Sequence, residues 1–181
     1  MEEILYRRIA RQELCLNLFA QFQRRQEVNL CWRRTEQGWT VRPDPFVDQW
    51  SREDYVFLVQ CLQGTLDGGG AVFGGFLSGG LKGFASVEGR PMGSRGQYRD
   101  LTSLHVSREL RGRGMGRQLF ALAARWAGDQ GGEKLYISSH SAVETQAFYR
   151  AMGCREAVEY DPGHVAREPY DCQLEYEIPK S

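Results

Sequence analysis

One stretch of the chain, Leu101–Gln130, constrains the fold most, because it predicts a strand, a glycine-rich turn and a helix in direct succession. The apolar strand around Leu104-His105-Val106 leads through RELRGRGMG into RQLFALAARWAGDQ, where apolar residues recur at the spacing of an amphipathic helix. A helix that begins after glycines leaves several backbone N–H groups without intrahelical partners, and its dipole adds positive potential there. The stretch therefore predicts a phosphate or pyrophosphate site at the start of this helix.

The residue types in the turn suit an anion. Three glycines allow the backbone to approach a ligand closely and to adopt a positive φ: Gly112, Gly114 and Gly116. Four arginines supply positive charge, with only Glu109 against them: Arg108, Arg111, Arg113 and Arg117. A glycine-rich strand-to-helix turn with solvated arginines is the alternative interpretation of the loop taken alone.

Two familiar phosphate-binding patterns do not fit this turn. The dinucleotide fingerprint GxGxxG needs a third glycine where Arg117 or Leu119 stands, and the P-loop needs a Gly-Lys pair that the chain lacks. The pattern that does fit is Arg-x-x-Gly-x-Gly, from Arg111 to Gly116, directly after a strand. This loop resembles the acyl-CoA loop of the GNAT superfamily of N-acetyltransferases.

A second constellation supports the same resemblance. Residues Leu135–Cys154 read LYISSHSAVETQAFYRAMGC, a strand followed by a helix that carries Ala147-Phe148-Tyr149 and ends at Gly153. This is similar to the second half of the GNAT signature, although Cys154 stands where relatives have Phe. Many relatives also have Asn near the start of this helix, where the chain offers Ser141, Glu144 and Thr145. The resemblance covers roughly residues 70–178.

The resemblance implies an α/β fold in one GNAT domain over residues 1–181, with a mixed, mostly antiparallel sheet flanked by helices. The sheet is expected to splay between two neighbouring parallel strands, those of Leu101 and Lys134, and acetyl-CoA would lie in the opening as acyl donor. The pantetheine arm would pair with strand backbone, and the pyrophosphate would lie on the glycine loop. The residues implied in cofactor binding are Leu104, His105, Val106, Arg111, Gly112, Arg113, Gly114, Met115, Gly116, Arg117, Thr145 and Phe148.

The resemblance also implies a general acid. Tyr149 stands where the family often has a tyrosine that donates a proton to the departing CoA thiolate. A phenol (pKa about 10) can protonate a thiolate (pKa about 8.5) only in direct, dry contact. The alternative is that Tyr149 packs under the cofactor.

The general base has several candidates. Some relatives carry a carboxylate six residues before the position of Val106, which is Asp100 here, and strand alternation predicts that Asp100 shares a face with Leu104. Alternatively, Asp100 only pairs with Arg99 or another neighbour. His140, at the end of the splayed strand, is the second candidate, and a water chain is a further possibility.

The other titratable side chains are weaker candidates for the base. Glu88 follows the preceding hairpin. His105 points to the face opposite Asp100 and is expected to be packed or hydrogen-bonded. His164 lies in a long polar loop, DPGHVAREPY, and is expected to be exposed.

Composition narrows the class and the compartment. The formal net charge of the 181 residues is zero, which argues against a nucleic-acid binder. No apolar run approaches 18 residues, and the first residues lack a signal-peptide core, so no membrane association is expected. Five cysteines without CxxC spacing predict reduced thiols in a cytoplasmic protein and no metal site.

The remaining elements are expected from periodicity and turn residues. They are a strand over Ile4–Ile9, a helix over Gln12–Gln26, a hairpin or loop over Leu30–Pro45 with its turn at Gln37-Gly38, a helix capped by Ser51 and stopped by the glycines after Asp67, a hairpin over Ala71–Val87, a strand over Lys134–Ser139, a helix over Ser141–Met152, and final strands over Cys154–Tyr160 and Asp171–Ile178.

The sequence thus predicts an N-acetyltransferase that moves acetyl from acetyl-CoA to a primary amine by direct attack in a ternary complex. The partners are acetyl-CoA and an unidentified small-molecule or peptide amine, and family members often form homodimers. One alternative is a non-catalytic acyl-CoA sensor or partner-binding module. The other is transfer of a longer acyl group, which bulk near Leu104 and Phe148 would disfavour.

Overall fold

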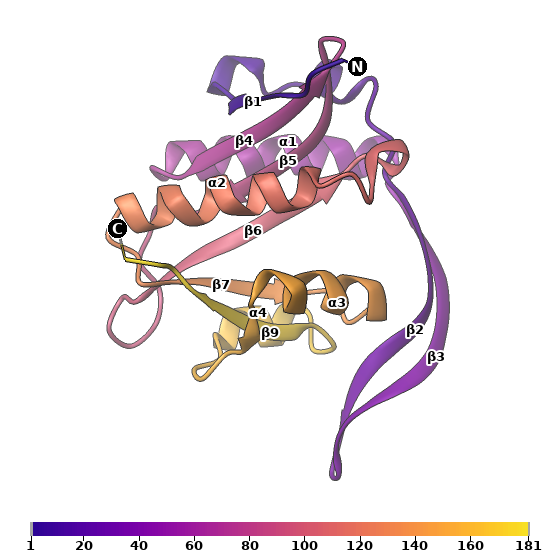
Figure 1. The fold of residues 1–181 in the computed structure, drawn as a ribbon, viewed down its shortest axis with the longest axis vertical. Coiled ribbons are helices and arrows are strands. Elements are labelled where there is room, and N and C mark those ends of the chain that lie inside the picture. Colours follow the sequence, from indigo (N-terminus) through magenta and orange to yellow (C-terminus); the bar gives the residue numbers. More distant parts are fainter. Residues whose placement is uncertain (1, 181) are drawn as a thin grey trace.

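A computed structural model describes residues 2–180 of the chain. Its centre is a seven-stranded sheet in the order β1-β4-β5-β6-β7-β9-β8, in which only β6 and β7 run parallel (Figure 1). The strands are β1 (Leu5–Arg8), β4 (Ala71–Leu77), β5 (Gly80–Val87), β6 (Tyr98–Val106), β7 (Lys134–Ser139), β8 (Arg155–Glu156) and β9 (Cys172–Glu177). The predicted fold class, a mixed and mostly antiparallel sheet that contains a parallel pair, is confirmed.

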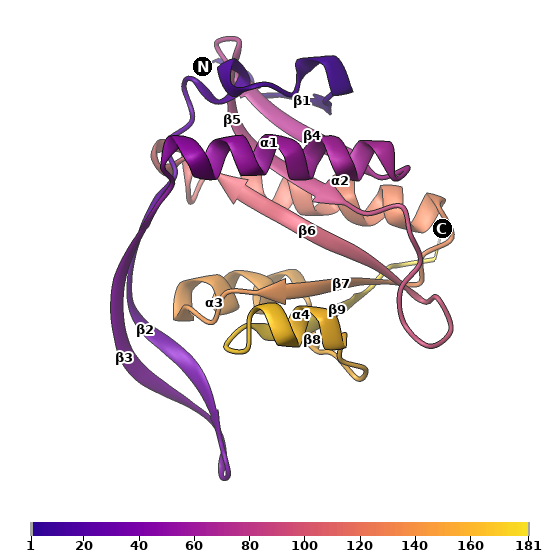
Figure 2. The same cartoon turned by 180° about the vertical axis from the view of Figure 1, so that it is seen from behind.

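Helices cover both faces of the sheet. They are α1 (Arg52–Asp67), α2 (Met115–Asp129), α3 (Val143–Met152) and α4 (Pro162–Arg167). The α2 and α3 helices lie on one face, and α1 and α4 lie on the other (Figures 1 and 2). Among residues 2–180, no helix combines the length and the hydropathy that crossing a bilayer requires.

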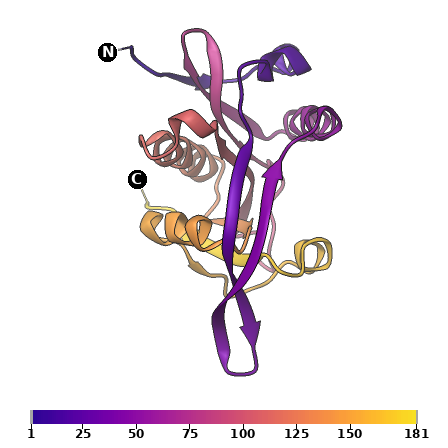
Figure 3. The same cartoon turned by 90° about the vertical axis from the view of Figure 1, so that its right-hand side faces the viewer.

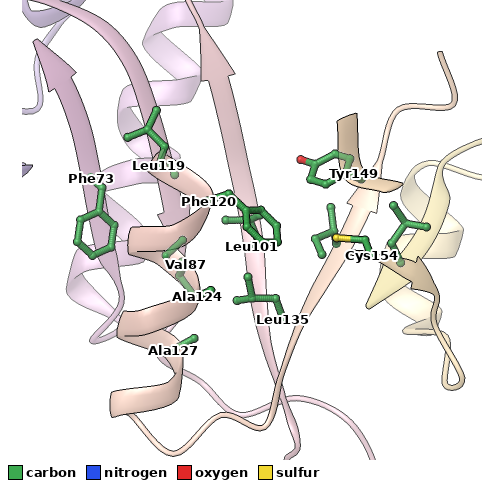
Figure 4. Packing of buried hydrophobic residues seen from close by; sticks show 14 of the residues in the cluster. Phe73, Val87, Leu101, Leu119, Phe120, Ala124, Ala127, Leu135, Tyr149 and Cys154 are labelled. Atoms are coloured by element: carbon green, nitrogen blue, oxygen red, sulfur yellow. The ribbon is translucent and has the colours of Figure 1, made fainter. Parts of the chain in front are cut away.

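The hydrophobic core has a layer on each face of the sheet. Between α2 and the sheet, Leu119 and Phe120 pack on Phe73, Val87 and other strand residues (Figure 4). Under α1, Val59 and Leu62 pack in one buried cluster with the strand residues Val72, Phe76 and Phe84. The sheet is therefore held firmly on both sides as far as β6, which fixes the position of the strand that precedes the glycine loop.

A long ribbon leaves this body. The strands β2 (Arg25–Thr35) and β3 (Gly38–Gln49) form a separate two-stranded sheet that runs beside the open end of the main sheet (Figures 1 and 3). The ribbon touches the main body in its middle, where the Trp32 N–H donates to the Ser141 carbonyl at 2.8 Å. The predicted turn at Gln37-Gly38 is confirmed, because Gly38 has a φ of +105°.

Three element predictions were wrong. The expected helix over Gln12–Gln26 is replaced by two short 3₁₀ turns, η1 (Arg11–Glu13) and η2 (Leu16–Phe19), and by the start of β2. Its apolar residues are buried as the spacing indicated, but the extended backbone at Cys15 interrupts the helix.

The other two wrong predictions lie near the C-terminus. The strand expected over Cys154–Tyr160 is limited to β8 (Arg155–Glu156), and the polar loop expected after it contains α4. There Pro162 occupies the first turn and the Asp161 carboxylate caps the helix by accepting from the His164 N–H at 2.9 Å.

Candidate active site

The sheet opens between β6 and β7. The two strands pair at only three positions, Tyr98–Lys134, Arg99–Leu135 and Asp100–Tyr136, and then diverge (Figure 2). Beyond Asp100, β6 stays paired with β5 on its other edge as far as Val106, and β7 stays paired with β9 as far as Ser139. Within the part of the chain that the structure describes, no strand pairs with the β7-facing edge of β6 over residues 101–106, so this edge is available for a ligand that can form backbone hydrogen bonds.

A cavity of about 730 Å³ lies along this free edge. Its walls are the end of β6, the glycine loop, the first turn of α2, one side of α3 and the base of the ribbon. The lining residues are Arg24, Gln26, Glu27, Leu104, His105, Val106, Leu110, Arg111, Gly112, Gly114, Gly116, Arg117, Glu144, Thr145, Phe148 and Tyr149. The structure thus brings the two motifs of the sequence, the glycine loop and the Ala-Phe-Tyr helix, around one cavity.

The start of α2 owes its geometry to glycine. Gly114 is the N-cap, with a φ of +86°, and Gly112 has a φ of +76°, a left-handed conformation that other residues adopt only with strain. The first bond of the helix runs from the Gln118 N–H to the Gly114 carbonyl at 3.1 Å. The N–H groups that precede it have no intrahelical acceptor, so they form an anion-binding end beside the cavity.

Gly116 is needed for a different reason. A Cβ atom at this position would lie 3.2 Å from the ring of Phe148 on α3. The absence of a side chain at Gly116 therefore lets α2 and α3 approach each other at the cavity.

Positive charge gathers at the cavity. The Arg111 guanidinium donates through Nε to the Val106 carbonyl at 3.1 Å, and burial together with the charges of Arg24 and Arg108 lowers its pKa. Arg24 is 9% exposed, pairs with Asp48 at 2.6 Å, and lies over the ring of Trp50. Neighbouring guanidinium groups repel each other, so a bound anion would relieve this repulsion.

The Tyr149 side chain points from α3 toward β6, and its hydroxyl lies at the end that faces β6 (Figure 4). The residue is 7% exposed and lines the cavity, and its ring packs edge-on against Phe120 and Phe148. Burial raises the pKa of the phenol well above its usual value, with smaller contributions from Cys154 and Asp171. The hydroxyl therefore carries its proton at neutral pH and is placed to donate into the cavity.

Asp100 does not share a face with Leu104, contrary to the alternation argument. The ladder between β5 and β6 shifts register between Ser86–Ser103 and Val87–Leu101, so Thr102 is an extra residue in β6. This bulge reverses the alternation. As a result Leu101 and Leu104 both pack in the α2 core, whereas Asp100 faces α4.

Asp100 pairs with His164 rather than with Arg99. The distance from His164 Nε2 to Asp100 Oδ2 is 2.5 Å, and the imidazole stacks on the ring of Tyr136. The expectation of an exposed His164 was wrong, because its side chain is 15% exposed and the carboxylate raises its pKa. Arg167 and Asp161 also face the imidazole. The charge of Arg167 lowers the pKa of His164, whereas that of Asp161 raises it. Asp100 Oδ1 is buried and has no hydrogen-bond partner within residues 2–180.

The other candidate bases are held by neighbours. His140 Nδ1 accepts the Ala142 N–H at 3.0 Å, so in the neutral ring the proton is on Nε2, and the ring lies 5.1 Å from that of Phe46. Glu88 accepts hydrogen bonds from Thr65 and Thr102 at 2.6 and 3.0 Å. His105 packs against Trp50 and Phe84, as expected, and burial beside Arg24 and Arg111 lowers its pKa to about 3.

Some predicted site residues lie away from the cavity, and some lining residues were missed. Asp100, His140, Arg113 and Met115 do not line it, and Met115 is instead buried under the strands β4 and β5. The missed lining residues are Arg24, Gln26, Glu27 and Leu110, whereas Glu144 lines the cavity beside Thr145. Arg24, Gln26 and Glu27 belong to the ribbon base. The first two fell in the expected helix and Glu27 directly after it, so no signal pointed from there to the cavity. Within residues 2–180, no three His, Cys, Asp or Glu side chains cluster as metal ligands.

Comparison with known proteins agrees with the geometry. A family model described as the acetyltransferase (GNAT) family matches residues 26–154. A nourseothricin acetyltransferase has a similar structure, with a TM-score of 0.68 and 20% identity over 97% of this chain and 99% of that one. No curated protein sequence is similar enough to count as a match.

Two further solved structures contain coenzyme A species. A Bacillus anthracis protein assigned as a streptothricin acetyltransferase, in complex with acetyl coenzyme A, gives a TM-score of 0.71 and 15% identity over 99% of both chains. The PaiA N-acetyltransferase of Thermoplasma acidophilum, in complex with coenzyme A, gives a TM-score of 0.60 and 13% identity over 97% of this chain and 99% of that one.

Proposed function

The chain belongs to the GNAT family of acetyltransferases, and on this basis we propose that it transfers an acetyl group from acetyl-CoA to a primary amine by direct attack in a ternary complex. The observation that carries the proposal is the unpaired edge of β6 running into the glycine loop along a single cavity. A non-catalytic acyl-CoA sensor would need the same edge and loop, but it would not need a proton donor such as Tyr149.

The donor substrate fits this cavity in two parts. The amides of the pantetheine arm would pair with the free backbone of residues 104–106, as an added strand pairs with a sheet edge. The pyrophosphate would lie on the N–H groups at the start of α2, between Gly112 and Arg117, where the dipole and the arginines favour negative charge. The structural relatives that hold acetyl coenzyme A or coenzyme A support this placement.

The reaction forms one C–N bond and breaks one C–S bond. The amine lone pair attacks the thioester carbonyl, and a backbone N–H on the free edge of β6 stabilises the negative charge that develops on the carbonyl oxygen. When the C–S bond breaks, the Tyr149 hydroxyl donates to the departing sulfur. Burial keeps the phenol protonated for this role, and the phenolate that results regains its proton from water.

The amine must lose a proton, because an ammonium group has no lone pair for attack. We infer that the Asp100–His164 pair accepts this proton through water. The pair lies where β6 and β7 begin to diverge, on the sheet face opposite α2, and one Asp100 oxygen has no hydrogen-bond partner among residues 2–180. His140 is the second candidate. To accept a proton through Nδ1, His140 would first have to break its hydrogen bond with the Ala142 N–H. We therefore assign His140 a different role, in which Nε2 donates a hydrogen bond to the acceptor.

The acceptor is an amine, and the charges near α4 favour a cationic one. Three carboxylates, Asp161, Glu168 and Asp171, lie at or near the ends of α4 and would suit a positively charged amine. Two of the similar structures carry the names of acetyltransferases for nourseothricin and streptothricin. The first acceptors to test are therefore nourseothricin, linear polyamines and a peptide with a free N-terminus.

The test has two stages, which separate the enzyme from the sensor. Calorimetric titration with acetyl-CoA, CoA and NAD should give binding of both CoA species and none of NAD. Release of free thiol is then followed with the acceptor panel. Thiol release with an amine supports the transferase, whereas binding of acetyl-CoA without turnover on any acceptor favours the sensor. Failure to bind either CoA species would contradict both functions.

A further inference from the structure

A second cavity, of about 250 Å³, lies under the outer half of the ribbon. Trp32 and Trp39 of the ribbon, Gln146 and Arg150 of α3, Glu156 of β8 and Gln173 of β9 contribute to its walls. None of the residues that line it also lines the active-site cavity. The α3 helix separates the two spaces, since Thr145, Phe148 and Tyr149 face one and Gln146 and Arg150 face the other.

The ribbon places two indole rings over this cavity. Trp32, Arg34 and Trp39 lie on one face of the ribbon, because Arg34 and Trp39 are cross-strand partners and Trp32 is two residues from Arg34. That face is held against the body by Arg34, whose Nη1 donates to Tyr160 Oη at 2.9 Å and to Glu156 Oε1 at 3.2 Å. Arg34 thus ties this part of the ribbon to the body beside the cavity, and Trp39 remains 37% exposed.

One positive charge at this cavity, that of Arg150, has no counter-ion among residues 2–180. The Arg150 guanidinium lies 5.1 Å from the centre of the Trp32 ring, and within residues 2–180 it forms no ion pair with a carboxylate. The other two arginines nearby are compensated, since Arg34 pairs with Glu156 at 3.2 Å and Arg155 pairs with Glu175 at 3.1 Å. The cavity therefore has a net positive rim.

The amide groups in the walls are already engaged. The Gln146 amide donates to Ser139 Oγ and to the His140 carbonyl, each at 2.7 Å. The Gln173 amide donates to Ser138 Oγ at 3.0 Å, and its oxygen accepts from Tyr136. A ligand would therefore find aromatic surface, a carboxylate already paired with Arg34, and one cation, Arg150, without an ion-pair partner among residues 2–180. The volume is below the range of roughly 300–1,000 Å³ typical of pockets for drug-sized ligands, so a compact ligand fits best.

We propose that this cavity is a second ligand site, which binds a small aromatic carboxylate with its ring against Trp32 and Trp39 and its carboxylate on Arg150. Ring stacking on indole and a guanidinium–carboxylate pair are the two interactions that these side chains supply. The site is independent of the proposed transferase activity, because its residues and its volume are separate from those of the active-site cavity.

The test uses benzoate as the probe and the indole N–H signals of the intact, ¹⁵N-labelled protein as the readout. The chain has four tryptophans, so each signal can be assigned with single substitutions. Benzoate should shift the signals of Trp32 and Trp39 in a saturable manner while Trp126 stays unchanged. Trp50 is the internal control for the other cavity, because it lies beside Arg24.

Two analogues and two variants test the chemistry of recognition. Benzamide keeps the ring without the charge, and cyclohexanecarboxylate keeps the charge without the aromatic face. Each should bind at least about 10-fold more weakly than benzoate, as the loss of one principal interaction implies. Arg150→Gln should weaken benzoate by a similar factor, whereas Arg125→Gln, an exposed arginine on α2, should have no effect.

The proposal is overturned if benzoate gives no saturable shift up to about 50 mM, a concentration far above the dissociation constants of most small specific ligands. It is equally overturned if the shifts fall on Trp50 instead, if benzamide binds as well as benzoate, or if Arg150→Gln binds benzoate unchanged.

Discussion

The two sides of the splayed sheet are built by different means. On the side of β6 and α2, the cavity is shaped by backbone: a free strand edge, two glycines with positive φ and the first turn of a helix. On the side of the ribbon and α4, the structure outside that cavity is held by side chains that meet from distant parts of the sequence. Arg33 reaches Ser141 at 2.7 Å across 108 positions, and Asp100 reaches His164 at 2.5 Å across 64.

This difference indicates where a change of side chain should alter substrate binding and where it should not. If the donor binds through backbone hydrogen bonds, many side chains are compatible with its binding, provided that none blocks its approach to the backbone. If the acceptor binds through side chains, the preference for a particular acceptor changes when a single contacting side chain changes. Substitutions on the two sides should therefore fall into separate kinetic classes, the first affecting the donor and the second the acceptor.

The largest effect is expected at the backbone-built side. Gly114→Val should weaken acetyl-CoA binding about 1,000-fold, because a β-branched residue at a φ of +86° distorts the helix start and removes charge-assisted hydrogen bonds to the phosphates. Calorimetric titration measures this loss. Gly114→Asn is the matched control, since Asn tolerates the left-handed conformation. If Asn binds as poorly as Val, obstruction by the Cβ atom rather than backbone strain is responsible.

The next largest effect is expected at Tyr149, the side chain on the proposed donor side to which we assign a role as proton donor. Tyr149→Phe should lower kcat about 100-fold and leave the dissociation constant of acetyl-CoA unchanged, because the ring still packs on Phe120 and Phe148 while the proton donor is lost. Tyr176→Phe, a second tyrosine packed on Phe120, is the control and should keep full activity. Equal loss of donor binding and turnover would mean that Tyr149 is only a packing residue.

The same difference explains what the sequence could predict. The proposed donor side lies within residues 104–117 and 144–149, where glycine spacing and helix periodicity act locally, and the predicted loop and helix line one cavity. The proposed acceptor side depends on contacts that no local pattern reports. The bulge at Thr102 reversed the face of Asp100, and the short capped helix α4 brought His164 to it. The hairpin or loop was expected to end at Pro45, whereas β3 continues to Gln49, because an edge strand tolerates proline.

A smaller effect is expected where the ribbon meets the main body. Arg33 donates to Ser141 Oγ at 2.7 Å and to Asp44 at 2.5 Å, and it lies 4.5 Å from the centre of the Tyr170 ring. Arg33→Gln should raise the KM for the acceptor about 10-fold, as the loss of charge-assisted contacts implies, with donor binding unchanged. Arg42→Gln on the same ribbon is the control. An equal change in both substrates would show that the two sides are not separate.

The smallest effect is on stability and depends on pH. Asp100 raises the pKa of His164, so the pair stabilises the fold when the imidazole is protonated, and this contribution is lost as the pH rises through the folded-state pKa. His164→Gln should therefore lower the free energy of unfolding by roughly 1 kcal/mol more at about pH 5.5 than at about pH 8.5, the upper end for a partly exposed ion pair. Urea denaturation at both values measures the difference. Asp100→Asn should reproduce it, and the double variant should add nothing, because both changes remove the same pair. A pH-independent loss would instead assign the effect of His164 to its stacking on Tyr136.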